Sequence, residues 1–171
     1  MKQEPLVSIV MGSRSDLDTL QETAKVLKEF DISYEMRIIS AHRTPDAARE
    51  FALSAEERGI RIIISGAGKA AHLGGVMASL SLLPVIGVPM KTSDLGGLDS
   101  LLSTVQMPGG IPVATVAIGK SGAKNAGLLA VAILAQQDKS LRGRLADYRK
   151  EMTDKVEAAD RELCEKAASG V

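Results

Sequence analysis

Residues 6–16 read Leu-Val-Ser-Ile-Val-Met-Gly-Ser-Arg-Ser-Asp, and the fold class can be inferred from their pattern. Residues 6–11 form a short apolar run rich in β-branched side chains, which predicts a buried strand. Gly12 ends that run, and apolar side chains then recur at helical spacing from Ser15 to Phe30. The stretch therefore predicts a strand, a loop and a helix in direct succession.

The same succession recurs along the chain. We predict further strands at residues 34–39, 61–65, 85–88 and 113–117. We predict further helices at residues 45–57, 95–105 and 123–137. Apolar strands separated by helices are typical of right-handed βαβ crossovers and of a parallel sheet that is buried on both faces. We therefore expect an α/β fold, a three-layer α/β/α sandwich with a five-stranded parallel sheet.

Residues 138–168 differ from the rest because they are highly charged and follow the last predicted strand. They predict one long C-terminal helix with a single apolar stripe, formed by Leu141, Leu145, Tyr148, Met152 and Val156. With no sixth strand to cover, the stripe either packs on another subunit or folds back on its own domain, and the sequence favours the two equally. We expect a single domain over residues 1–171, with residues 1–137 as its core.

Composition excludes several classes of partner. Lys and Arg together number 21, as do Asp and Glu, so no net charge is available to hold a nucleic acid. Two Phe, two Tyr and no Trp provide no platform for stacking bases. No apolar run approaches the roughly 20 residues that span a bilayer, and the lone Cys164 cannot form an internal disulfide. We expect a cytoplasmic protein with a small-molecule ligand and no membrane or nucleic-acid partner.

Ligands of open parallel sheets bind beyond the carboxyl ends of the strands, so the loops after the strands carry the candidate site. The first loop holds Gly12, Ser13, Ser15 and Asp16 at a predicted helix start, where hydroxyls, free amides and the helix dipole favour an anionic oxygen. Asp16 suits sugar hydroxyls better than a phosphate. The alternative is that Ser13 or Ser15 only caps the helix and Asp16 only complements its dipole.

The second loop is Ser40-Ala41-His42-Arg43-Thr44-Pro45, with Thr44 as predicted helix cap and Pro45 as first helical residue. Arg43 offers a bidentate fork to phosphate, and histidine is the residue type whose ordinary pKa, about 6.5, suits proton transfer. A structural role for His42 is the alternative.

The third loop, residues 65–75, is rich in Gly and Ala and contains His72. Its small residues let backbone amides approach a ligand. Gly66 and Gly68 are not followed by the third glycine of a dinucleotide site, and no Ser or Thr follows Lys69 as in nucleoside triphosphatases. Metal ligands are too few for a catalytic zinc site. Residues 106–112 form a further turn cluster, either an ordinary loop or a lid or subunit contact.

Four ordered segments together resemble the PurE family of purine biosynthesis over about Val7 to Asp138: residues 11–16, 40–45, 66–73 and 106–112. The resemblance implies a flavodoxin-like sandwich assembled as an octamer. Class I members are N5-carboxyaminoimidazole ribonucleotide mutases, whereas class II members carboxylate aminoimidazole ribonucleotide with carbon dioxide. Ala70-Ala71-His72-Leu73 is similar to the class I segment, where class II has an Arg-Ser-Asn type of segment, so the mutase is expected.

The resemblance also implies roles for residues. Ser13, Asp16 and Arg43 bind the ribonucleotide and His42 is the general acid and base, without cofactor, metal or nucleoside triphosphate. Other residues implied to line the substrate site are Gly12, Ser15, Ser40, Ala41, Gly68, Ala70, Ala71, His72 and Leu73. We assign His72 to shaping a carbon dioxide pocket, with a second catalytic role as the alternative. Direct carboxylation and a non-catalytic module that binds a phosphorylated ligand are the competing hypotheses.

Two residues depart from the family's usual run. Lys69 stands where the family has glycine, and Gly74 stands where it has proline. A positive φ at residue 69 would be strained, and its ammonium could point inward to a carboxylate or outward to solvent. Outward is the favoured expectation. Gly74 is expected to loosen the start of the following helix.

Overall fold

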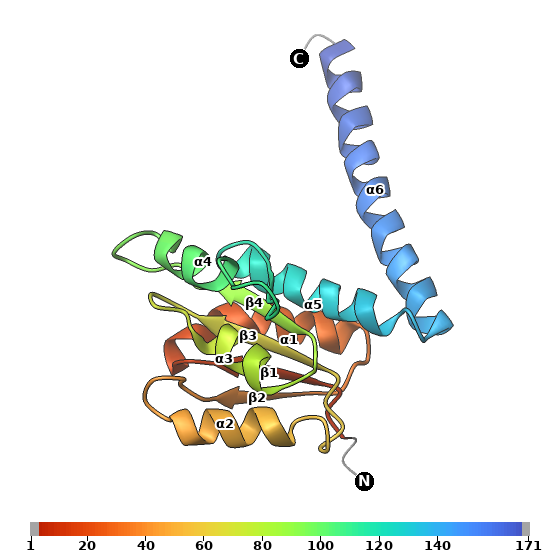
Figure 1. Ribbon diagram of the computed structural model, residues 1–171. Helices are drawn as coiled ribbons and strands as arrows, with labels where there is room; N and C mark the ends of the chain where they lie inside the picture. The colour runs from red at the N-terminus through yellow and green to blue at the C-terminus, as the bar shows by residue number, and fades with distance from the viewer. Residues whose placement is uncertain (1–3, 169–171) are drawn as a thin grey trace. The chain divides into compact units, whose positions relative to one another are not determined.

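The computed structural model describes residues 4–168 and shows alternating strands and helices (Figure 1). The chain divides after Ala130 into two compact units. The first unit contains strands β1 (Val7–Met11), β2 (Tyr34–Ile38), β3 (Ile62–Ala67), β4 (Val85–Pro89) and β5 (Ala114–Thr115). Its helices are η1 (Arg14–Asp16), α1 (Leu17–Glu29), α2 (Pro45–Ser54), α3 (Leu73–Leu80), α4 (Leu98–Val105) and the first part of α5 (Lys120–Leu134).

All five strands are parallel and lie in the order β2-β1-β3-β4-β5. Val7 pairs with Tyr34 of β2 on one side and with Ile62 of β3 on the other. The predicted α/β fold with a five-stranded parallel sheet is therefore confirmed, and β1 lies between β2 and β3.

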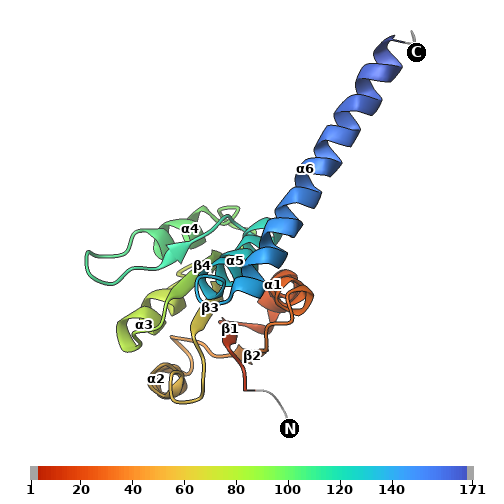
Figure 2. The same cartoon turned by 90° about the vertical axis from the view of Figure 1, so that its right-hand side faces the viewer.

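Helices cover both faces of the sheet (Figure 2). One face carries α2, α3 and α4, and its buried cluster includes Phe51, Ile63 and Met77. The other carries α1 and the start of α5, where the buried Thr23 hydroxyl donates to the Ala123 carbonyl at 2.7 Å. Burial of β1, β3 and β4 on both faces follows from these two layers and stabilises the fold through the hydrophobic effect.

Several predicted boundaries differ from the structure. β2 is an edge strand and is only partly buried, with Ile38 57% exposed, so it is not covered on both faces. β5 has two residues, Ala114 and Thr115, rather than the predicted 113–117. α4 begins at Leu98 rather than at residue 95, because Gly96 and Gly97 take positive φ angles of 65° and 100° that a right-handed helix excludes.

The second unit comprises residues 131–171, of which the structure describes those up to 168. It contains the end of α5 and the helix α6 (Lys139–Ala168), which confirms the predicted long C-terminal helix. The Asp138 carboxylate caps α6 by accepting from the Leu141 amide at 3.0 Å. In the predicted apolar stripe, Leu141 is buried, whereas Met152 and Val156 are 53% and 71% exposed. Among the described residues, no helix is both long and apolar enough to cross a membrane.

Gly87 of β4 provides a test of the packing between the sheet and α4. A Cβ at this position would overlap the Thr104 methyl and lie 2.9 Å from Val113 Cγ1. We predict that Gly87→Ala lowers the free energy of unfolding by about 1 to 3 kcal/mol, because both neighbours are part of the packed face. Gly109→Ala, where a Cβ would meet nothing within 4 Å, is the control and should change stability little. Chemical denaturation measures both, and equal stability of the two variants would contradict the packing described.

Candidate functional site

The three predicted loops meet at the carboxyl edge of the sheet because β1 lies between β2 and β3. The Gly12 amide donates to the Gly66 carbonyl at 3.2 Å, which joins the first loop to the third. Arg43 Nη2 donates to the Gly12 carbonyl at 2.8 Å, which joins the second loop to the first. Gly12 and Gly66, which are 54 positions apart in the printed sequence, thus share one site.

The first loop is organised around Ser13. Ser13 caps η1, and its Oγ accepts from the Ser15 amide at 3.3 Å and from the Ser15 hydroxyl at 3.0 Å. The predicted capping role is therefore real. Both hydroxyls lie at the start of the α1 region, where the amino end of a helix favours negative charge.

Asp16 is the last residue of the first loop, and its negative charge is unfavourable there. Partial burial raises the pKa of its carboxyl above the ordinary value, although hydrogen bonds from the Ser15 hydroxyl at 3.3 Å and from the Ser13 backbone, and the charge of Arg43, oppose the shift. Its ionised form is therefore disfavoured in the folded chain. Such a group is typical of a binding site, where a ligand hydroxyl can supply the missing hydrogen bond.

The second loop is tied by hydrogen bonds to Ser40. Its Oγ accepts from the Arg43 amide at 3.1 Å. The Thr44 hydroxyl accepts from the Ser40 amide at 2.9 Å and donates to the Ser40 carbonyl at 3.0 Å. Thr44 occupies the cap position of α2 and Pro45 is the first helical residue, as predicted, but the Thr44 side chain does not bond the helix. These bonds leave His42 and Arg43 exposed at the carboxyl edge.

The two histidines lie against each other. His42 Nε2 is 2.8 Å from His72 Nδ1, and the rings meet edge to face with centroids 4.9 Å apart. His42 follows β2 and His72 precedes α3, so the pair bridges the second and third loops. One of the two nitrogens must carry the proton of this bond.

The third loop bends sharply at Lys69, whose φ of 60° is the positive angle that glycine tolerates. Its ammonium is exposed and contacts Asp94 Oδ2 at 2.6 Å, which confirms the outward direction. Gly74 lies inside α3, which still begins at Leu73, and a Cβ there would make only ordinary contacts. The expected loosening of the helix start therefore finds no support in the packing.

Sequence reasoning missed three residues that hold the third loop. They are Asp94, Ser100, which accepts from the Lys69 amide, and Ser103, which donates to the Lys69 carbonyl. Residues 91–97 follow β4 at the same carboxyl edge as the other loops. The position after a strand is the signal that could have found Asp94, whereas Ser100 and Ser103 lie inside α4 and carry no such signal.

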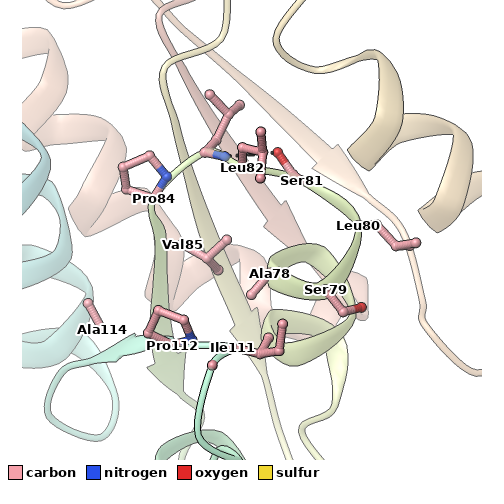
Figure 3. A pocket seen from close by; sticks show the side chains of 12 residues that line it. Ala78, Ser79, Leu80, Ser81, Leu82, Pro84, Val85, Ile111, Pro112 and Ala114 are labelled. Atoms are coloured by element: carbon pink, nitrogen blue, oxygen red, sulfur yellow. Dashed lines mark hydrogen bonds between the residues drawn. The ribbon is translucent and has the colours of Figure 1, made fainter.

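A separate hollow of about 540 Å³ opens at the other end of the sheet (Figure 3). Pro84 and Ala114 lie at the amino ends of β4 and β5, and Ile111 and Pro112 line the hollow as well. No titratable side chain lines it, so it offers no acid or base for catalysis. Residues 111 and 112 of the predicted turn cluster lie here. At the cluster's other end, Met107 packs on α3, since a Cβ at Gly75 would meet its sulfur at 3.1 Å.

Among residues 4–168, no three His, Cys, Asp or Glu side chains cluster in a way that could hold a metal ion. The site instead presents hydroxyls, one guanidinium, one carboxyl and two imidazoles. This set can bind a phosphorylated, hydroxylated ligand and move a proton on it.

Comparison with known proteins agrees with this chemistry. A family model described as AIR carboxylase matches residues 6–155, which include all three loops and the turn cluster. The chain belongs to the AIR carboxylase family. The AIR carboxylase match therefore extends past the sheet into α6.

Curated relatives in this family are highly similar. The N5-carboxyaminoimidazole ribonucleotide mutase of Pyrococcus horikoshii is 58% identical over 164 residues, which are 95% of this chain and 92% of the relative. The mutase of Bacillus subtilis is 55% identical over 150 residues, 88% of this chain and 92% of the relative. The crystal structure of Treponema denticola PurE is 32% identical with a TM-score of 0.84, over 93% of this chain and 98% of that one.

Asp16 gives a prediction that separates binding from stability. Because its pKa is raised in the folded state, the ionised carboxylate opposes folding, and this cost appears as the pH rises through the ordinary aspartate range. We predict that Asp16→Asn is as stable as the parent chain or more stable at pH 7, by less than about 1 kcal/mol for a solvent-screened group. The difference should vanish towards pH 3.

Thermal unfolding across this pH range measures the effect, with Asp46→Asn, in the exposed first turn of α2, as control. A clear loss of stability in Asp16→Asn at pH 7 would contradict a raised pKa of the Asp16 carboxyl in the folded chain.

Proposed function

We propose that this chain is an N5-carboxyaminoimidazole ribonucleotide mutase of purine biosynthesis, an isomerase that moves a carboxylate from N5 to C4 of the aminoimidazole ribonucleotide. The printed names of curated relatives at 55% to 58% identity support this reaction. The Ala70-Ala71-His72-Leu73 segment, similar to that of class I, also supports it.

The observation that carries the proposal is the His42–His72 contact of 2.8 Å beside a phosphate cradle. Ser13, Ser15 and Arg43 form the cradle, and Asp16 accepts from the ribose hydroxyls. Gly12, Ser40 and Ala41 complete its walls, with the two hydroxyls and the guanidinium within one hydrogen-bonded group of loops. Phosphate and ribose held in this way present the imidazole base to the histidines.

The histidine pair moves a single proton through the cycle. His42 as imidazolium gives its proton to N5 while the bond between N5 and the carboxylate carbon breaks, which releases carbon dioxide. The C4 carbon of the base then attacks carbon dioxide and forms the new bond. Neutral His42 removes the C4 proton, which restores both the aromatic ring and the imidazolium, so atoms and charge balance without a cofactor.

His72 supports this cycle through its bond to His42. The bond uses His42 Nε2 and His72 Nδ1, so the other nitrogen of each ring can contact the substrate without breaking the pair. An imidazolium at either ring donates to its neighbour, and the extra proton is held between two acceptors. Gly68, Ala70, Ala71 and Leu73 of the third loop then form the wall that confines carbon dioxide until C4 attacks it.

Direct carboxylation of aminoimidazole ribonucleotide is the second candidate. The description of the matching family as AIR carboxylase favours it. It would use the same phosphate cradle but draw carbon dioxide from solution. The two candidates differ in the substrate that turns over, and a non-catalytic binding module would turn over neither.

We propose further that the enzyme is a cytoplasmic homo-octamer in which the exposed stripe of α6 packs on another subunit. Support comes from the exposure of Met152 and Val156, since an uncovered apolar face in water is costly. We predict a particle of eight times the 18.0 kDa chain mass by light scattering, and a smaller particle for Met152→Glu with Val156→Glu. Glu157→Gln, in the charged part of the same helix, is the control, and an unchanged mass in the double variant would exclude this packing.

His42→Asn tests the catalytic assignment. We predict that kcat falls at least about 100-fold, because acid and base catalysis is lost, while the dissociation constant for the ribonucleotide changes by less than about threefold. Absorbance assays with the carbamate substrate measure turnover, and calorimetry measures binding. Full activity of this variant would exclude His42 as the proton carrier.

The same absorbance assay decides between the candidates. The parent chain should convert N5-carboxyaminoimidazole ribonucleotide without ATP or added bicarbonate. A rate that requires aminoimidazole ribonucleotide and rises with bicarbonate would favour direct carboxylation. Ligand-induced stabilisation without product from either substrate would favour the binding module.

A further inference from the structure

Lys69 takes a backbone conformation that its side chain opposes. Its φ is 60°, in the left-handed region where a Cβ crowds the adjacent carbonyl oxygen. A strained residue of this kind persists only where its surroundings hold it. Three contacts, all from residues after β4, hold Lys69.

Two of these contacts fix the backbone of Lys69. Its amide donates to the buried Ser100 Oγ at 2.9 Å, and its carbonyl accepts from Ser103 Oγ at 3.0 Å. Both serines belong to α4. The peptide groups on each side of the strained residue are therefore docked on one helix.

The third contact is the ion pair between Lys69 Nζ and Asp94 Oδ2 at 2.6 Å. The side chains are 67% and 58% exposed, so solvent and salt screen the pair. Hydrogen bonding and the charge of the partner raise the pKa of Lys69 and lower the pKa of Asp94. Both groups thus stay charged around neutral pH, and ionic strength rather than pH weakens the pair.

Lys69 lies directly before the segment that reaches the histidine pair. Ala71 is 1% exposed, and His72 bonds His42 at 2.8 Å. Only two residues separate Lys69 from His72, so a change in the backbone at residue 69 would move His72.

We propose that Lys69 is a positioning residue whose salt-sensitive ion pair with Asp94 holds the strained loop so that His72 meets His42. The proposal rests on the proposed function of that site. Because of the ion pair, the position of His72 depends on ionic strength. A glycine at residue 69 would adopt this φ without strain and would not need the pair.

Four variants test whether the Lys69–Asp94 ion pair positions His72: Lys69→Ala, Lys69→Gly, Asp94→Asn and the double variant Lys69→Gly with Asp94→Asn. We expect Lys69→Ala and Asp94→Asn to lower kcat about three- to tenfold with KM within about twofold, because the phosphate cradle is untouched. Lys69→Gly should keep the parent kcat, and Asp94→Asn should have no effect in that background. Glu22→Gln, which removes an exposed ion pair of the same 2.6 Å length on α1, is the control.

Salt provides a second arm of the same experiment. At saturating substrate, 1 M salt should lower kcat of the parent chain towards that of Lys69→Ala and leave Lys69→Gly unchanged, since a Debye length of about 3 Å weakens an exposed ion pair. A merely structural role of Lys69 would change stability without this difference in salt response.

Histidine resonances provide a readout that does not need turnover. The chain contains two histidines, both in the pair, so ring ¹³C–¹H spectra of histidine-labelled, tag-free protein contain only site signals. Asp94→Asn and Lys69→Ala should shift the His72 signal, whereas Lys69→Gly and Glu22→Gln should not.

An unchanged His72 signal in Asp94→Asn, or a loss of kcat in Lys69→Gly equal to that in Lys69→Ala, would overturn the proposal. If the parent chain converts neither substrate, the proposed function fails, and the histidine spectra still decide the role of Lys69. Asp94→Asn alters only an exposed side chain, so it keeps the test valid if Lys69→Ala does not fold.

Discussion

The position of β1 between β2 and β3 governs where every candidate site residue lies. Parallel pairing of β1 with β2 and with β3 brings the carboxyl ends of the three strands to one edge, and the loops that follow them therefore lie side by side. The Gly12–Gly66 and Arg43–Gly12 bonds then fix the loops to each other through backbone carbonyls. The histidine contact is a consequence of this arrangement, since it joins the loops on either side of the central one. A change in strand order would separate the two rings.

Two residues of the candidate site, Asp16 and Lys69, take positions that lower the stability of the fold. Asp16 is held where burial disfavours its charge, and Lys69 is held in a left-handed turn. Neither arrangement helps the chain fold, and the buried strands β1, β3 and β4 compensate for both. A rigid sheet below strained polar loops lets the site keep its geometry before substrate arrives, which is how preorganisation lowers a reaction barrier.

Much of the fold could be predicted from local patterns, because the apolar runs of β1, β3 and β4 and the helical spacing of α1 and α6 are carried by neighbouring residues. Failures occurred where tertiary context decides. β2 is exposed because it lies at an edge of the sheet, a position that its apolar residues do not reveal, although Glu35 and Arg37 between them are typical of an edge strand. The apolar pattern predicts α4 from residue 95, whereas the positive φ of the two glycines before Leu98 delays its start.

The candidate site was predictable in its members but not in its contacts. Ser13, His42 and Arg43 follow strands in the sequence, and the position after a strand identifies them. The His42–His72 contact and the Lys69–Asp94 pair join residues at least 25 positions apart in the printed sequence, and only the packed sheet brings them together. Lys69 takes a positive φ, and its partner after β4 explains how the loop accommodates its side chain.

The mutase reaction requires that carbon dioxide stays at the site between its release from N5 and its capture by C4. The most direct measurement uses substrate labelled with ¹³C in its carbamate carboxylate, converted in excess unlabelled bicarbonate, with the product analysed by mass spectrometry. We predict that most of the product carries the label in its C4 carboxylate. Product whose carboxylate matches the unlabelled bicarbonate would contradict the account, because carbon dioxide would then come from solution.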